Sequence, residues 1–266
     1  MIIVKIIGGL GNQMFQYALG KYLAIKHNTN LILDLSGYES YKVWKFELDN
    51  LNVHYENNLF DRTTFQYIQE KYFHFDPDML NLPDNVNLDG YWQSEKYFKD
   101  IEEILRKDFS VTSPINEANQ RLLDLINSTN SVSLHIRRGD YITNPSANAF
   151  HGTCSLDYYN KSIKHLIERV NNPHFFLFSD DPEWVKENIL INEPVTVVDI
   201  NTINNGCDDL RLMMSCKHNI IANSSFSWWG AWLNNNPQKI VIAPEKWFLS
   251  PVHNTKDVMP QGWIKL

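Results

Sequence analysis

The chain has 266 residues, 43% of them hydrophobic, which is enough for one large or two ordinary α/β domains with complete cores. Its formal net charge of −7 argues against a broad nucleic-acid-binding surface, so any site for an anion must be local. The sequence has no apolar run of about 18 residues and no signal peptide. We therefore expect a cytoplasmic protein with no transmembrane segment and no nucleic-acid partner.

The N-terminal half opens with a β-loop-α-β pattern. Its predicted segments are a buried strand at 2–7, a tight loop at 8–13, a helix at 14–27 and a second strand at 31–33. The aromatic-rich region 38–84 has no clear period and receives no prediction. Two helices follow, the first capped by Ser94 and the second with apolar residues between 115 and 126.

The C-terminal half alternates strands and helices. Strands are predicted at 132–136, 175–178, 195–198, 219–222 and 239–243, with helices near 155–170, 182, 208–215 and 224–233 between them. This alternation is typical of parallel doubly wound sheets. The simplest architecture has two Rossmann-like domains, 1–130 and 131–266, that face a cleft.

The strongest local feature follows the predicted strand at 132–136. Arg137 and Arg138 come where this strand ends. Adjacent guanidinium groups are costly to bury unless an anion meets them, and the planar fork of arginine matches phosphate oxygens. Strand alternation places His135 on the face of Arg137, which we therefore expect to bind the ligand. Arg138 is then expected to pair with Asp140, although a purely structural arginine pair is the alternative.

A glycine-rich loop follows the first predicted strand. Gly8-Gly9-Leu10-Gly11-Asn12-Gln13 resembles a dinucleotide fingerprint, but Met14 occupies the third glycine position. Because this loop has few side chains, a ligand can approach the backbone N–H groups at the start of the helix. A tight turn without a ligand is the alternative. Asp34 lies near the place of a ribose-binding acid, which keeps a nicotinamide-dependent oxidoreductase as a rival function.

Two further strand ends carry polar side chains. Asp180 and Asp181 follow a predicted strand and could bind ribose hydroxyls or orient an arginine. Asp181 is equally suited to cap a helix that begins at Pro182. Ser224 and Ser225 begin another helix, where hydroxyl and N–H groups can bind an anion, with an ordinary capped helix as the alternative.

No metal site is predicted. The nine histidines form no H-E-x-x-H or similar ligand spacing. Asp76-Pro77-Asp78 has the D-x-D form of some metal-dependent sugar transferases, but it follows no evident strand and such triplets are common by chance. We expect neither a metal nor another cofactor.

Taken together, these segments resemble the α-1,2-fucosyltransferases of glycosyltransferase family 11. The segment from His135 to Tyr141 is similar to the H-x-R-R-G-D-Y motif of that family at every position. The other similar segments occur in the order of the family, at 8–14, 90–98, 178–181 and 223–229. The chain most resembles short bacterial members that decorate O-antigen repeat units.

The resemblance implies a GT-B type α/β fold in which domain 1–130 mainly holds the acceptor and domain 131–266 holds GDP-L-fucose. It also implies metal-independent, inverting transfer of L-fucose to O2 of a terminal β-galactose, in an oligosaccharide or an O-antigen repeat unit. Because such an acceptor can be lipid-linked, peripheral contact with the inner face of the membrane stays open.

The chemistry of the donor then assigns roles to single residues. Arg137 and Asn12 would neutralise the charge that grows on the departing diphosphate, as catalytic residues. Similarity to related fucosyltransferases places His135 and Asp209 at the guanosine end. The remaining donor-binding candidates are Arg138, Asp180, Asp181, Ser224 and Ser225. Glu95 and Asp34 are the acceptor-side candidates, and the general base is not assigned.

The sequence leaves several alternatives open. One is a transferase that uses another nucleotide sugar on the same fold, which donor competition would reveal. The others are the oxidoreductase named above and a non-catalytic carbohydrate-binding protein, which would bind glycans without turnover. The penultimate sugar of the acceptor and the oligomeric state are also not determined.

Overall fold

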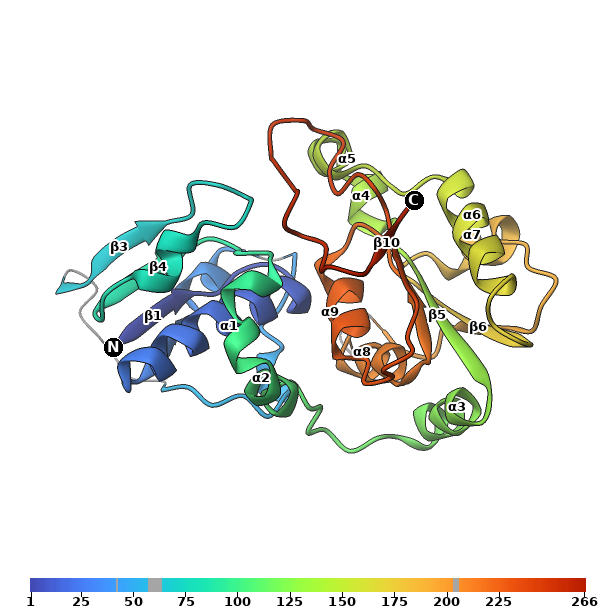
Figure 1. The fold of residues 1–266 in the computed structure, drawn as a ribbon, viewed down its shortest axis with the longest axis horizontal. Helices are drawn as coiled ribbons and strands as arrows, with labels where there is room; N and C mark the ends of the chain where they lie inside the picture. The colour runs from blue at the N-terminus through green and yellow to red at the C-terminus, as the bar shows by residue number, and fades with distance from the viewer. Residues whose placement is uncertain (42, 57–63, 203–205) are drawn as a thin grey trace. The chain divides into compact units, whose positions relative to one another are not determined.

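A computed structural model describes residues 1–41, 43–56, 64–202 and 206–266 of the chain (Figure 1). These residues form two compact units, each with its own sheet. The first unit comprises residues 1–113 and 253–260, and the second comprises residues 114–252 and 261–266. Parts of the region 38–84 that received no prediction, residues 42 and 57–63, lie outside the described residues.

This division differs from the predicted boundary after residue 130. Helix α3 (Glu117–Ser128) packs on α8 (Gly206–Ser215) and on strand β5 (Asn130–Ile136). Its Ile126 is completely buried in a core cluster together with Phe176. The packing of its apolar face therefore assigns α3 to the second unit.

The first unit is built on a parallel four-stranded sheet with the order β2-β1-β4-β3. Its strands are β1 (Ile2–Lys5), β2 (Leu31–Asp34), β3 (Gln66–Gln69) and β4 (Val86–Asp89). Helix α1 (Leu10–His27) joins β1 to β2. The predicted opening unit is confirmed, although α1 begins at Leu10, so the loop before it is shorter than expected.

Among its described residues, the first unit also contains several short helices. They are η1 (Ser36–Glu39), η2 (Leu48–Asn50), η4 (Pro77–Asn81), η5 (Glu95–Tyr97), η6 (Lys99–Ile101) and α2 (Glu102–Asp108). The helix predicted after Ser94 is broken into η5, η6 and α2, because Phe98, with a φ of −143°, lies outside the helical range. Four of the apolar residues predicted to share one helix face are buried, whereas the fifth, Ile104, is 38% exposed; the buried ones are Tyr97, Phe98, Ile101 and Leu105.

The second unit has a parallel six-stranded sheet with the order β10-β9-β8-β5-β6-β7. Beside β5, its strands are β6 (Pro173–Ser179), β7 (Val195–Val198), β8 (His218–Ile220), β9 (Val241–Ala243) and β10 (Ile264–Lys265). Beside α3 and α8, its helices are α4 (Gly139–Thr143), α5 (Pro145–His151), α6 (Leu156–Ile167), α7 (Pro182–Asn188) and α9 (Ser225–Leu233). The predicted alternation is confirmed, with α4, α5 and β10 added.

Strand order marks one edge in each unit as a place for ligands. In the second unit the order is that of classic doubly wound sheets, and the direction of winding reverses between β5 and β8. In the first unit the connection from β1 runs to β2 on one side, whereas β4 and β3 lie on the other. Ligands of open parallel sheets bind outside the carboxyl ends of the strands at such a reversal.

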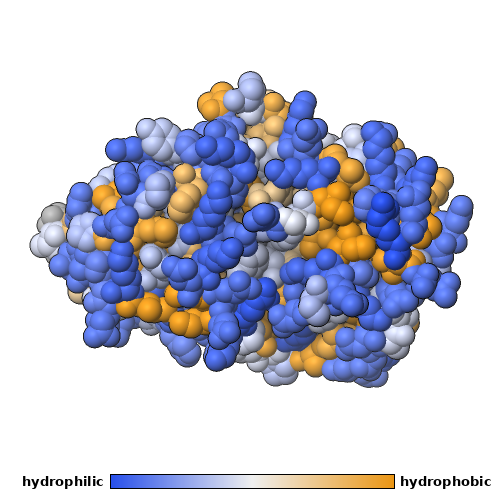
Figure 2. Space-filling view, viewed as in Figure 1, coloured by the Kyte–Doolittle hydropathy of each residue, from blue (hydrophilic) through white to orange (hydrophobic). Residues whose placement is uncertain are grey.

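The face shown in Figure 2 carries mainly hydrophilic side chains, with hydrophobic areas between them. Within the described ranges, none of the helices combines the length and the apolar character needed to cross a membrane.

Candidate active site

Arginine and aspartate side chains gather at the carboxyl ends of β5 and β6. The two strands are parallel neighbours, and their last residues Ile136 and Ser179 are in register. Arg137 follows β5, and its Nη1 lies 2.7 Å from Asp180 Oδ2. Its Nη2 pairs with Asp140, three residues along the chain. Two carboxylates therefore neutralise Arg137, whose side chain is only 13% exposed.

Arg138 makes a separate set of contacts. Its Nε lies 2.9 Å from Asp181 Oδ2, and its guanidinium carbon is 3.8 Å from the centre of the Trp184 ring. The prediction that Arg138 pairs with Asp140 is wrong, because the side chain turns toward α7 and stacks on Trp184 there. Stacking and a charge-assisted hydrogen bond together hold this arginine firmly.

Asp180 and Asp181 act first on the protein itself. Asp180 Oδ1 accepts the backbone N–H of Arg138 at 2.9 Å while Oδ2 pairs with Arg137. This approach requires Gly139, because a Cβ at that position would stand 2.4 Å from Asp180 Oδ2. The cap prediction for Asp181 is confirmed, since its Oδ1 accepts the N–H of Trp184 at 3.3 Å.

An aromatic stack lies behind Arg137. The Tyr141 ring centre is 5.3 Å from the Arg137 guanidinium carbon. The His151 ring stacks on Tyr141 with centroids 4.5 Å apart and planes 4° from parallel. Tyr141 is part of the predicted motif, but His151 was not identified from the sequence, because only the packing of α5 brings it beneath Tyr141.

His135 is a buried, neutral imidazole just before Arg137. Burial lowers its pKa to about 4. Among the described residues its Nδ1 has no hydrogen-bond partner, and its ring meets Phe226 of α9 edge-on at 5.9 Å. A buried ring nitrogen without a partner is costly, so this atom is suited to a hydrogen bond with a ligand.

The amino end of α9 lies beyond β8, the neighbour of β5 in the sheet. Ser224 is the N-cap residue, but its side chain makes no capping hydrogen bond. Its C=O accepts the N–H of Trp228 at 3.0 Å. The start of α9 therefore stands at the winding reversal of the sheet, with Ser225 in its first turn, as expected for an anion site.

Asp209 forms a distinct group in α8. It accepts a hydrogen bond of 2.8 Å from Asn201 Nδ2, and Asn201 and Asn119 exchange two more hydrogen bonds. Burial raises the pKa of Asp209 to about 6. Its hydrogen-bond partners come from the α3–α8 side of the unit rather than from the arginine cluster.

At the equivalent edge of the first unit, β1 and β4 end in an ion pair of Lys5 and Asp89, and amide side chains lie beyond the strand ends. Gln93 Nε2, after β4, donates to Asn12 Oδ1 in the first turn of α1 at 2.9 Å. Gln13 Nε2 donates to the carbonyls of Gly8 and Lys45 at 2.9 and 2.7 Å. Both glutamines lie in segments that resemble the family, 8–14 and 90–98, but amide side chains have no charge or spacing pattern from which these contacts could be predicted.

The acceptor-side candidates also belong to the first unit. Asp34 is 4% exposed, and its Oδ1 accepts the N–H of Ser36 at 3.0 Å. Glu95 is the first residue of η5 and is half-buried. The structure thus joins Arg137, Arg138, Asp180 and Asp181 in one cluster, with Ser224 and Ser225 at the end of a strand beside it. Asp209 stands apart, and Asn12, Asp34 and Glu95 lie in the other unit.

Among the described residues, no group of three or more histidine, cysteine, aspartate or glutamate side chains is arranged to hold a metal ion. The D-x-D triplet has a structural explanation. Asp76 is the N-cap of η4, and its Oδ1 accepts the N–H of Asp78 at 3.1 Å.

Comparison with known proteins gives a family match over the whole chain: residues 1–266 fit the model described as "Glycosyl transferase family 11". An Escherichia coli protein named alpha-1,2-colitosyltransferase is 40% identical over 294 residues, covering 100% of this chain and 99% of that protein. The E. coli O-antigen biosynthesis glycosyltransferase WbnK is 33% identical, covering 97% and 98%. The galactoside 2-alpha-L-fucosyltransferase Sec1 of Mus musculus is 24% identical, covering 94% and 72%.

Solved structures show a similar fold. The NodZ alpha-1,6-fucosyltransferase, co-crystallised with GDP, matches with a TM-score of 0.52 at 15% identity, covering 86% of this chain and 90% of that one. At this identity the likeness concerns the fold alone. It confirms the predicted GT-B type α/β architecture of paired Rossmann-like units.

Proposed function

The chain belongs to glycosyltransferase family 11 and is a glycosyltransferase, and from this premise we propose that it moves L-fucose from GDP-β-L-fucose to O2 of a terminal β-galactose. The proposed transfer is inverting and gives an α-1,2 linkage. The acceptor is an oligosaccharide or an O-antigen repeat unit, free or lipid-linked. The proposed location is the cytoplasm, including the inner face of the membrane for a lipid-linked acceptor.

One observation carries the proposal. Arg137 lies at the winding reversal of the second sheet, between the cluster that follows β6 and the amino end of α9 that follows β8. A guanidinium and a helix N-terminus at one edge are suited to a diphosphate. The same arginine lies in the segment that resembles the fucosyltransferase motif.

The proposed reaction forms one bond to C1 of fucose and breaks another. The galactose O2 attacks C1 of fucose, and the bond between C1 and the β-phosphate oxygen breaks with its electron pair on the phosphate. The O2 proton leaves to a base, and GDP is the other product. Because the attack is in line, the β-linked donor gives an α-linked product.

The protein lowers this barrier by stabilising the charge on the leaving diphosphate. We assign that role to Arg137, assisted by Asn12 and by the N–H and hydroxyl groups of Ser224 and Ser225. Arg137 is already paired with Asp140 and Asp180, so the diphosphate exchanges with at least one of these carboxylates.

The other candidates fit supporting roles. His135 Nδ1 and the Asp209 carboxylate are assigned to the guanosine end of the donor. Arg138, Asp180 and Asp181 hold the loop that carries Arg137. For the acceptor, Glu95 suits a base better than Asp34, which is 4% exposed and already caps a turn. No metal or other cofactor is required in this scheme.

A second donor is favoured by one specific observation. The relative that is 40% identical is named an alpha-1,2-colitosyltransferase, and colitose is fucose without its 3-hydroxyl group. The alternative function is therefore the same transfer from another GDP-sugar, with colitose as the first choice.

Product analysis tests the proposal. Purified protein is mixed with GDP-fucose, EDTA and β-galactosides that differ in the penultimate sugar, and products are analysed by mass spectrometry and linkage NMR. We expect a deoxyhexose on galactose O2, undiminished by EDTA. Competition with GDP-colitose ranks the two donors. No transfer from either donor to any galactoside, despite GDP binding, would contradict the proposal.

A further inference from the structure

The turn after β4 in the first unit is strained. Trp92 has a φ of +50°, which is unfavourable for a bulky residue. Its carbonyl accepts the N–H of Ser94 at 2.8 Å, and its side chain is completely buried. The surrounding structure must hold this conformation, because the local backbone does not favour it.

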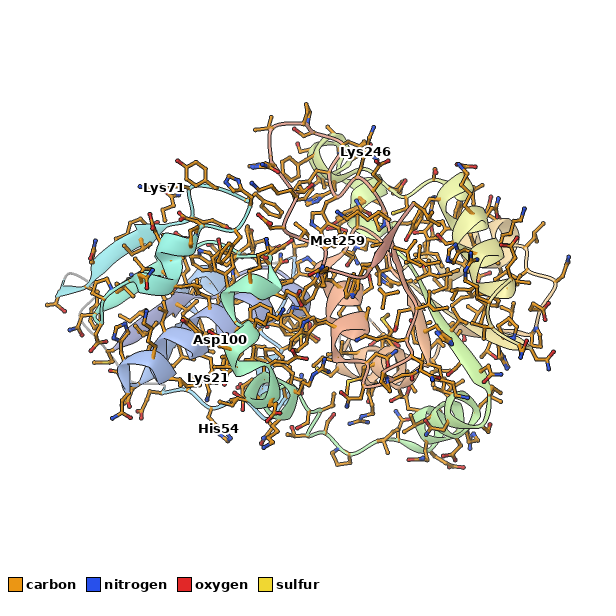
Figure 3. The ribbon with its side chains drawn as sticks, viewed as in Figure 1. Lys21, His54, Lys71, Asp100, Lys246 and Met259 are labelled. Carbon is orange, nitrogen blue, oxygen red and sulfur yellow. The ribbon has the colours of Figure 1, made fainter. Side chains whose placement is uncertain are left out.

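Glu70 is the group that holds it. The residue follows β3, and its backbone N–H donates to Asp89 of β4 at 2.9 Å. Its two carboxylate oxygens accept the N–H groups of Tyr91 and Trp92 at 2.7 and 2.9 Å. Burial raises the pKa of Glu70, and both described hydrogen bonds of its carboxylate come from this turn. Lys71, labelled in Figure 3, marks where the chain leaves β3 beside it.

The contact between Glu70 and the turn is close. A Cβ on Gly90 would stand 2.4 Å from Glu70 Cβ, so only glycine fits there. The Gly90 carbonyl accepts Gln16 Nε2 of α1 at 3.0 Å. The turn is thus bound on one side by Glu70 and on the other by α1.

The turn ends at Gln93, which donates to Asn12 Oδ1. Because Asn12 Oδ1 accepts this hydrogen bond, the amide group has one orientation, with its donor nitrogen Nδ2 on the side away from Gln93. This is the orientation that Asn12 needs to meet a negatively charged oxygen. Gln93 and Asn12 thus join the segments that follow β4 and β1, on the two sides of the reversal of the first sheet.

We propose that Glu70 is a positioning residue of the transfer reaction, which rests on the proposed function. Its carboxylate holds the strained Tyr91–Trp92 turn, the turn places Gln93, and Gln93 orients the Asn12 amide. Glu70 itself touches neither donor nor acceptor in this scheme. It therefore acts on turnover through Asn12.

A double-mutant cycle tests the chain of contacts. Glu70→Gln keeps the size but replaces one acceptor oxygen with a donor group, and Gln93→Leu removes the donor to Asn12. Each is expected to lower kcat about 10-fold with little change in the KM of the acceptor. The kcat of the double variant is expected to be no lower than that of the less active single variant. Glu103→Gln, an exposed change on α2 of the same unit, is the matched control. Glu70→Asp should restore part of the loss, because it keeps the carboxylate.

Hydrogen exchange gives a readout independent of activity. Glu70→Gln should speed exchange in peptides covering 90–94 and also in those covering 9–13, whereas Glu103→Gln should change neither. Losses in kcat that multiply, or faster exchange confined to 90–94, would overturn the proposal. If the wild-type protein transfers no sugar, the proposed function fails, while the exchange data still decide whether Glu70 controls the Asn12 segment.

Discussion

The two units carry similar edges of parallel sheet with different chemistry. In the second unit, the strand ends at β5 and β6 hold two arginines and three aspartates in direct ion pairs. In the first unit, β1 and β4 end in the single ion pair of Lys5 and Asp89, and beyond these ends the amides of Asn12 and Gln93 form a hydrogen bond. An edge with two arginines is suited to a diphosphate, and paired amide groups are suited to sugar hydroxyls and to fine orientation. We therefore propose that the donor's phosphates bind mainly to the second unit.

Changing Arg137 breaks the charged edge and should have the largest effect. Arg137→Lys keeps one positive charge but loses the fork that pairs with Asp180 and Asp140 and that the bound diphosphate would take over in part. We expect kcat to fall roughly 100- to 1000-fold, as on loss of a group that stabilises a transition-state oxyanion. Steady-state kinetics measure this loss. Arg121→Lys is the control, because the Arg121 side chain lies on the exposed face of α3. Near-normal turnover by Arg137→Lys would refute its role.

The pH dependence of stability tests two buried titratable groups of the second unit, Asp209 and His135. The pKa of Asp209 is about 6 in the fold against 3.8 ordinarily, so the folded state binds more protons between these values. Asp209 therefore lowers stability as pH rises through that window. His135, with a pKa of about 4 against 6.5, has the opposite effect, because the unfolded state takes up the proton first.

Asp209→Asn should leave the His135 effect unopposed. The increase in the free energy of unfolding between about pH 4.5 and about pH 6.5 should then be larger than in the wild type, by about 2 kcal/mol. Urea unfolding at the two pH values measures it, and effects of other groups cancel in the difference. An equal increase in both proteins would show that Asp209 is not held in a raised-pKa state.

Changing Asn12 breaks the amide pair of the first unit and should lower turnover less. Asn12→Ala removes a dipole rather than a charge, so we expect a loss in kcat of about 10-fold. Gln120→Ala, a change outside both edges, provides the comparison. A loss as large as that of Arg137→Lys would place the main phosphate contact in the first unit and reverse the comparison.

The smallest effect is expected at Ser224. Its side chain does not cap α9, so Ser224→Ala should leave the melting temperature unchanged while raising the KM of the donor about 3-fold. Ser155→Ala is a matched control, because Ser155 Oγ accepts the N–H of Tyr158 at 3.1 Å at the start of α6. That variant should lose about 1 kcal/mol of stability with no change in KM. The same pattern in both variants would exclude a donor contact at Ser224.

Much of the fold follows from local pattern, but some elements do not. The apolar runs of β1, β5 and β6 and the capping residue Asp181 predict their elements well. Strand β3 (Gln66–Gln69) was not predicted, because it is an edge strand with mostly exposed side chains and no apolar alternation. Its pairing with β4 is a long-range contact that local sequence does not encode.

The candidate site divides in the same way. The residue types at the strand ends were predictable, because arginine, aspartate and serine at these positions are chemically distinctive. Their partners were not: Arg137 rather than Arg138 holds Asp140, and Glu70 and His151 carried no local signal. Pairing is decided by the direction of side chains in three dimensions, which depends on how α5 and α7 pack.

A crystal structure of the protein with GDP tests the central claim most directly. The account predicts β-phosphate oxygens within hydrogen-bond distance of Arg137 and of the N–H groups at the start of α9, with at least one of the ion pairs to Asp140 and Asp180 opened. A diphosphate held by the Gly8–Gln13 segment, with Arg137 still bound to both carboxylates, would contradict it.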